Sequence, residues 1–186
     1  MKTAYLDTNI IISLLKPTDP FYTSSKIILQ SPFVKNIIST LTLVEIKSVI
    51  SRQLGELLEN LSDKIKDLIK NLSDEETVEL IYHYLLESIT FEIYENLAIQ
   101  ESSISVYKGK IFSVYSLALQ LSNITKLRTL DNLQLAHSLQ IHQESNEKID
   151  YFVTGDLNFL NQIDVIRNKF PFTILAPDKL LNLEKS

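Results

Sequence analysis

Short apolar runs alternate along this chain with longer stretches in which apolar residues recur at helical spacing. The runs have the length of buried strands and cover residues 3–7, 36–40, 88–91, 151–154 and 172–175. Because helical stretches separate them, the pattern predicts an α/β fold: a parallel sheet with helices on both faces. In such sheets a ligand site lies beyond the carboxyl ends of the strands.

The helical stretches differ in how clearly the sequence indicates a helix. Residues 56–72 form the most amphipathic one, and the segment that begins Ser73-Asp74-Glu75-Glu76 predicts a capping box that opens a helix ending near Leu86. Further helices are expected over residues 9–15, 21–30, 42–52, 94–105, 109–122 and 126–143.

Length and composition favour one domain over residues 1–186, with a helical elaboration at about 53–88. Gly and Pro are scarce (3 and 5 residues), which argues against long disordered tracts. Asp7 and Asn9 interrupt the apolar N-terminal run, so it does not read as a signal peptide, and no other run is long enough to span a bilayer. We therefore expect a cytoplasmic protein with no membrane partner.

The residues available for chemistry narrow the choice of metal. The chain has no cysteine, which excludes disulfides, thiol nucleophiles and cysteine-based zinc sites. Its three histidines are scattered, and we expect His137 on the surface. Any metal must therefore be held by oxygen ligands, which favours Mg²⁺ or Mn²⁺. The net charge of −5 opposes phosphate binding unless acids hold metal ions that reverse the local charge.

Four carboxylates are expected at one edge of the sheet. Asp7 closes the first predicted strand and Asp156 follows the fourth, so parallel strands would place both at the carboxyl edge. Glu45 and Asp131 each interrupt an apolar helical stripe that should face the core. A carboxylate is rarely buried without a partner, and neither stripe offers a cation. A shared metal would accommodate all four acids.

Each acid also has a structural interpretation. Asp7 and Asp156 could cap the helices that follow them, and Glu45 could form a capping box with Thr42. Asp131 is expected in the middle of its helix, where Asp is a poor helix former. The functional hypothesis therefore depends on the conjunction of the four acids at one edge.

The order of the motifs resembles the PIN-domain family, over about residues 3–176. The segments that carry the resemblance are Tyr5-Leu6-Asp7-Thr8-Asn9, Leu43-Val44-Glu45, Leu130-Asp131-Asn132-Leu133-Gln134-Leu135-Ala136 and Val153-Thr154-Gly155-Asp156. The resemblance implies a PIN-like domain with a five-stranded parallel sheet. It also implies an endoribonuclease dependent on Mg²⁺ or Mn²⁺, a hydrolase that cleaves RNA phosphodiester bonds with a metal-activated water.

The resemblance also implies roles for individual residues and partners. The four acids (Asp7, Glu45, Asp131 and Asp156) become catalytic metal ligands, and three neighbours (Thr8, Asn9 and Thr154) become their supports. Many small relatives are VapC-like toxins of toxin–antitoxin pairs, which implies RNA as substrate, a homodimer and an inhibitory antitoxin protein. This chain departs from the pattern at Asn158, where an acid is usual, and in its greater length between Arg52 and Thr125.

Two other classes of function compete with a nuclease. A phosphatase of the haloacid dehalogenase type also begins with a strand that ends in Asp, but it needs a second Asp two residues later, where this chain has Asn9. A PIN-like scaffold could instead bind RNA or protein without cutting it. Metal binding would not separate a scaffold from an enzyme, whereas turnover would.

Overall fold

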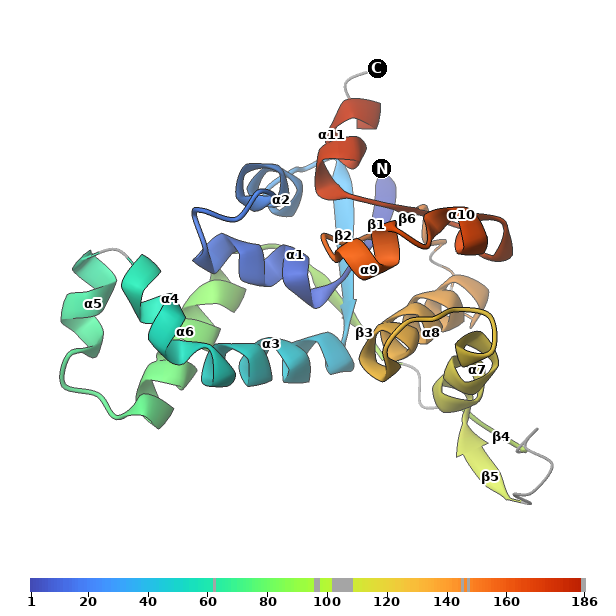
Figure 1. The fold of residues 1–186 in the computed structure, drawn as a ribbon, viewed down its shortest axis with the longest axis horizontal. Helices are drawn as coiled ribbons and strands as arrows, with labels where there is room; N and C mark the ends of the chain where they lie inside the picture. The colour runs from blue at the N-terminus through green and yellow to red at the C-terminus, as the bar shows by residue number, and fades with distance from the viewer. Residues whose placement is uncertain (62, 96–97, 102–108, 145, 147, 185–186) are drawn as a thin grey trace.

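A five-stranded parallel sheet lies at the centre of the computed structural model, which describes all residues except 62, 96–97, 102–108, 145, 147 and 185–186 (Figure 1). The strands are β1 (Lys2–Leu6), β2 (Val34–Ser39), β3 (Glu92–Tyr94), β6 (Tyr151–Val153) and β7 (Thr173–Leu175). Their order is β3-β2-β1-β6-β7, and every neighbouring pair is parallel. The predicted fold class, a parallel sheet of five strands with helices on both faces, is confirmed.

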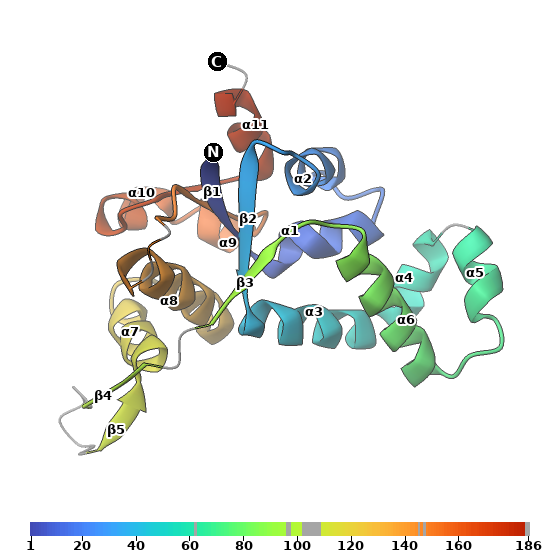
Figure 2. The same ribbon diagram turned by 180° about the vertical axis from the view of Figure 1, so that it is seen from behind.

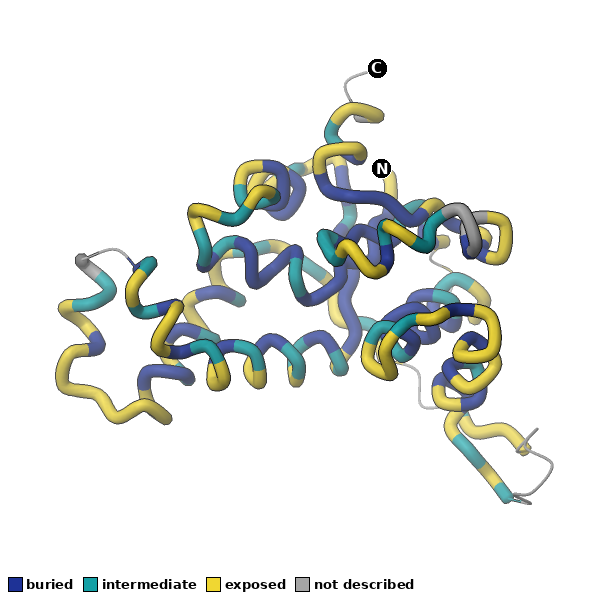
Figure 3. Tube along the Cα trace, in the orientation of Figure 1, coloured by how far each residue is buried: buried dark blue, intermediate teal, exposed yellow. Residues whose placement is uncertain are grey.

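Alternate side chains of the central strands enter two separate cores. In β1, Ala4 and Leu6 belong to one cluster and Tyr5 to the other, and all three are fully buried. The first face is covered by α1 (Thr8–Ile12), α2 (Tyr22–Leu29), α3 (Thr40–Arg52) and α11 (Pro177–Glu184). The second is covered by α7 (Ser113–Ser122), α8 (Thr129–Glu144), α9 (Leu157–Leu160) and α10 (Ile163–Ile166). Figure 3 shows β1 and β6 buried between these layers, which explains the apolar runs at their positions, whereas β3 at the edge of the sheet is mostly exposed.

Three helices extend away from the sheet beyond the end of α3 (Figure 2). They are α4 (Leu54–Asn60), α5 (Asp63–Ile69) and α6 (Asp74–Glu87). The capping box at Ser73 is confirmed, since Glu76 N donates to its Oγ and its own N donates to Glu76 Oε2. The single helix predicted over 56–72 is wrong: the chain becomes extended at Leu61 (φ −72°, ψ 150°). A straight helix of that length would carry its end about 25 Å away from its start, whereas the break lets Leu61 and Ile69 join the same core cluster.

The segment before α7 differs most from expectation. The third strand lies at Glu92–Tyr94 rather than at 88–91, and the helix predicted over 94–105 is absent from its described residues. There, β4 (Ile99–Glu101) pairs antiparallel with β5 (Lys110–Phe112), and residues 102–108 lie outside the described residues. Most side chains of this two-stranded sheet are exposed. The sequence therefore shows no alternation of apolar and polar residues from which these strands could be predicted. The helices predicted from 109 and from 126 begin later, at Ser113 and Thr129.

Two short 3-10 helices complete the described elements, at Ser13–Leu15 and Arg167–Lys169. Among the helices in the described part of the chain, none has the length and apolar character needed to cross a membrane.

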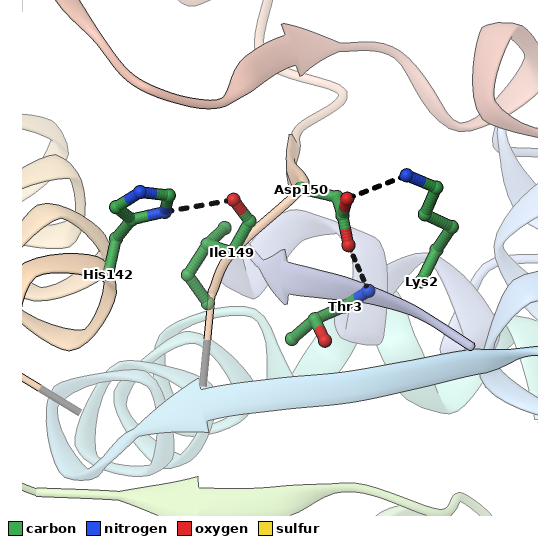
Figure 4. A network of polar contacts seen from close by, with 5 residues as sticks. All are labelled: Lys2, Thr3, His142, Ile149 and Asp150. Atoms are coloured by element: carbon green, nitrogen blue, oxygen red, sulfur yellow. Dashed lines mark hydrogen bonds and ion pairs between the residues drawn. The ribbon is translucent and has the colours of Figure 1, made fainter. Parts of the chain in front are cut away.

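Asp150 joins the amino ends of β1 and β6 (Figure 4). Asp7 and Asp156 follow the other ends of these two strands. Lys2 Nζ donates to its Oδ1 at 2.8 Å and Thr3 N donates to its Oδ2 at 2.9 Å. Partial burial raises the pKa of Asp150, but these two bonds, together with the positive charges of Lys2 and the N-terminus, outweigh burial and hold the pKa below its ordinary value.

We expect Asp150→Asn to lower the free energy of unfolding by about 1 kcal/mol at pH 7, the usual net worth of such a hydrogen bond. Because the folded-state pKa is depressed, this contribution is present above about pH 4 and is lost as pH falls through the folded-state pKa. Urea titrations of the parent and the variant between pH 2.5 and 7 measure the difference. A difference that stays constant down to pH 2.5 would contradict the electrostatic origin.

Candidate functional site

The four predicted acids line one cleft. It measures about 640 Å³ and includes Asp7, Glu45, Asp131 and Asp156. The cleft lies at the carboxyl ends of the neighbouring strands β1 and β6. After β1 the chain continues into α1 and α2 on one face of the sheet, whereas α7 and α8, which precede β6, cover the other face (Figure 1). Such a reversal of strand order is the usual place for a ligand site in an open parallel sheet. The tertiary structure therefore brings together residues that are up to 149 positions apart in the sequence.

Asp7 is the most enclosed of the four acids, with 6% of its surface exposed. Its Oδ2 accepts hydrogen bonds from Asn9 Nδ2 and Thr154 Oγ1, each at 2.6 Å. Burial raises the pKa of Asp7 to about 7; the bond from Thr154 opposes the shift, and the charges of Glu45 and Asp131 add to it. Asp7 occupies the N-cap position of α1, but its side chain makes no capping bond. The capping interpretation of this carboxylate is therefore wrong.

Glu45 reaches the cleft from the second turn of α3. Its Oε2 accepts from Thr8 Oγ1 at 2.7 Å and from Gln134 Nε2 at 2.9 Å. Ser39 is the N-cap of α3 and makes no side-chain capping bond, while Thr42 donates to Gln134 at 3.2 Å. Glu45 therefore does not form the alternative capping box with Thr42. Its carboxylate is held by partners from α1 and α8.

Asp131 lies in the first turn of α8, not in the middle of a helix as predicted. The helix begins at Thr129, and Asp131 Oδ2 accepts from Arg128 N at 3.2 Å. An acidic side chain is favourable there because it satisfies a free amide and faces the positive end of the helix dipole. Burial raises the pKa of Asp131, and the charges of Asp156 and Glu45 add to the shift. Asp131 thus has a helix-start role as well as a position in the cleft.

Asp156 is the N-cap of α9, as its structural interpretation proposed. Its Oδ1 accepts from Asn158 N at 2.6 Å, and its own N donates to Thr154 Oγ1 at 3.0 Å. Its charge also raises the pKa of Asp131. One carboxylate therefore both starts a helix and contributes to the negative charge of the cleft.

The three predicted supports all contact the acids. Thr8 donates to Glu45, while Asn9 and Thr154 donate to Asp7. Asn9 Oδ1 also accepts from Gly155 N at 2.7 Å, which joins the start of α1 to the end of β6. A Cβ at position 155 would lie 2.8 Å from Phe21 Cδ2, so glycine permits this close approach.

Gln134 is a site residue that the sequence left without a role. It lies in α8 one turn after Asp131 and is 1% exposed. The available signal was a polar side chain between Leu133 and Leu135, three residues after a candidate acid. Tyr5 was also overlooked: its hydroxyl donates to Gln134 Oε1 at 2.5 Å, and burial raises its pKa above the ordinary value. His137 was predicted on the surface, but it is buried, which lowers its pKa.

Basic side chains line the same cleft. Lys16 pairs with Glu56 at 2.8 Å, whereas Arg52 and Arg128 are exposed and form no ion pair among the described residues. Arg52 Nε donates to Ser48 O at 3.3 Å. The cleft therefore combines four acids with exposed guanidinium groups, which suit phosphate oxygens.

The acids share the cleft without converging on one point. Among the described residues, no three His, Asp or Glu side chains stand close enough together to hold a metal ion in this conformation. The donor set nevertheless consists of carboxylate oxygens, the ligands that Mg²⁺ and Mn²⁺ prefer. Carboxylates repel one another in the absence of a cation, so metal binding would require their side chains to move inward.

Comparison with solved structures gives distant structural likenesses. No protein-family model and no curated protein sequence matches the chain. A chain in the crystal structure of VapBC2 from Rickettsia felis bound to a DNA fragment from their promoter is similar, at 12% identity and a TM-score of 0.48. The alignment covers 94% of this chain and 98% of that one.

Proposed function

We propose that this chain is a ribonuclease of the PIN-like type that depends on Mg²⁺ or Mn²⁺ and hydrolyses RNA phosphodiester bonds. The observation that carries the proposal is the group of four carboxylates in one cleft, with Asp7 almost fully buried among neutral donors. An ionised carboxylate without a cation is costly to bury, and like charges beside it increase that cost. A divalent cation would relieve both effects.

Each acid has a defined part in this proposal. Asp7, Glu45, Asp131 and Asp156 would hold the metal, and Asn9, Thr154 and Thr8 would orient the carboxylates to which they donate. When bound, the metal supplies a Lewis acid that neutralises charge on the phosphate and makes water a better nucleophile. Arg52 and Arg128, at the rim of the cleft, would bind phosphates on either side of the scissile one. The homodimer and the antitoxin partner stay predictions from the motif resemblance.

Cleavage of a defined RNA pool tests the proposal. The pool contains single-stranded, structured and circular RNA, and the purified chain is incubated with it in Mg²⁺, Mn²⁺ or EDTA. We expect cleavage with either metal, none in EDTA, and none with Asp7→Asn prepared in parallel as the control for contaminating nucleases. Cutting of the circular RNA identifies an endonuclease, because that substrate has no ends.

Two outcomes would contradict the proposal in different ways. Cleavage that is equal for the parent and Asp7→Asn would mean that the activity comes from elsewhere. RNA binding by the folded chain without cutting under any metal would favour the non-catalytic scaffold.

A further inference from the structure

A buried chain of hydrogen bonds runs behind the cleft and ends on Glu45. Its central residue is Gln134, and its other members come from β1, α1 and the start of α3. We propose that Gln134 is a positioning residue, which fixes the carboxylate of Glu45 in the orientation that metal binding requires. This inference rests on the proposed metal-dependent function and assigns a role that the four acids do not fill.

Both ends of the Gln134 amide are engaged. On one side, Nε2 donates to Glu45 Oε2 at 2.9 Å and lies 3.3 Å from Thr8 Oγ1. On the other, Oε1 accepts from Tyr5 at 2.5 Å and from Thr42 at 3.2 Å. The side chain is 1% exposed, so water does not compete for these bonds.

The carboxylate of Glu45 gives the amide a defined direction. Glu45 Oε2 accepts from Nε2, which leaves Oε1 toward the hydroxyls of Tyr5 and Thr42. The Tyr5 hydroxyl also lies 2.8 Å from Ser39 Oγ. The reverse orientation would set the amide oxygen against the Glu45 carboxylate and leave the hydroxyls facing an NH₂ group. Tyr5 is itself held in place, because its ring stacks on Phe152 with centroids 5.5 Å apart. The packing of Tyr5 in the core of the sheet therefore helps to fix the orientation of the Gln134 side chain.

The two carboxylate oxygens of Glu45 differ in their hydrogen bonds. Oε2 accepts from both Thr8 and Gln134, whereas Oε1 receives no hydrogen bond from the described residues. A glutamate side chain has three rotatable bonds and loses entropy when it is ordered. With Oε2 held, that loss occurs on folding rather than on metal binding, and Oε1 stays available as the ligand. Partners that orient a ligand in this way commonly change metal affinity by about 10- to 100-fold.

The same helix offers a matched control. Gln140 is also in α8 and also 1% exposed, but its Nε2 donates to Ser113 and to Glu144, outside the cleft. Replacing either glutamine with methionine keeps the length and packing of the side chain and removes its hydrogen bonds. A purely structural role predicts similar effects of the two changes, whereas a positioning role predicts different ones.

The test is a calorimetric titration of the full chain with Mn²⁺ at pH 7.5, with thermal unfolding measured in EDTA on the same samples. We expect Gln134→Met to weaken Mn²⁺ binding by about 10- to 100-fold and Gln140→Met to change it by less than about twofold. Tyr5→Phe removes the hydroxyl that bonds Gln134 Oε1 and Ser39 Oγ, and should weaken binding in the same direction by a smaller factor. It also provides the measurement if Gln134→Met does not fold.

The outcomes separate this inference from the proposed function. Parent binding that is lost in Asp7→Asn but unchanged in Gln134→Met and Tyr5→Phe overturns the positioning role and leaves the metal site intact. Equal weakening in Gln134→Met and Gln140→Met assigns the effect to loosened packing and also overturns it. A folded parent that binds no Mn²⁺ overturns the proposed function, and the positioning role with it.

Discussion

Asp131→Asn is expected to reduce metal-dependent RNA cleavage by at least about 100-fold, which corresponds to roughly 3 kcal/mol of lost transition-state stabilisation. The change removes one negative charge from the cleft that Asp131 shares with the other three acids. It keeps a side-chain oxygen that can still accept from Arg128 N, so the first turn of α8 should persist. Cleavage should therefore fall without a matching loss of stability.

Asp150→Asn is the matched control for this change. It makes the same substitution at the amino ends of β1 and β6, where the carboxylate bonds Lys2 and Thr3 instead of lining the cleft. Single-turnover cleavage with Mn²⁺ and urea unfolding should be measured on both variants. We expect Asp150→Asn to lose stability and keep its cleavage rate, and Asp131→Asn to do the opposite. Cleavage by Asp131→Asn at the parent rate would contradict a catalytic role for Asp131 and would leave only its hydrogen bond at the start of α8.

Asp7→Asn is expected to stabilise the chain in EDTA at pH 8, although it should abolish metal-dependent activity. The pKa of Asp7 is raised to about 7 in the folded protein, mainly by burial, from an ordinary value near 4 in the unfolded chain. Between these values the folded state holds a proton that the unfolded state has released, so stability falls as pH rises through this window. The full loss is on the order of 4 kcal/mol, because one pKa unit corresponds to about 1.4 kcal/mol.

An asparagine at position 7 cannot ionise, so its stability should not follow this titration. Urea unfolding of the parent and of Asp7→Asn in EDTA, between pH 4.5 and 8.5, should show a gap that widens in favour of the variant up to about pH 8. The pKa of Asp131 is raised as well, but that residue titrates in both proteins and largely cancels in the difference. Adding Mn²⁺ at pH 8 should stabilise only the parent, because ligand binding to the folded state adds to its stability. A gap that does not change with pH would contradict a buried, protonated Asp7.

Gln134 marks the limit of what a sequence shows about the site. Most residues of α8 are polar, so the burial of Gln134 was not evident from the sequence. Its partners were not evident either: Tyr5 is 129 residues away and Glu45 is 89 residues away. The spacing of apolar residues along a helix can indicate that a side chain faces the core, but it does not indicate which polar group that side chain contacts. Only the packing of α8 against β1 and α3 decides that.

The sequence by itself determined four of the five central strands, β1, β2, β6 and β7, and the oxygen-only donor set, because short apolar runs and the lack of cysteine are visible locally. It also identified Asp7, Glu45, Asp131 and Asp156, because charges inside or beside apolar runs are conspicuous. The tertiary structure decided that α8 begins close to Asp131 rather than well before it, that Leu61 ends a helix, and that β4 pairs with β5. These outcomes depend on contacts between distant segments, whose free energy outweighs the weak local preferences that a sequence displays.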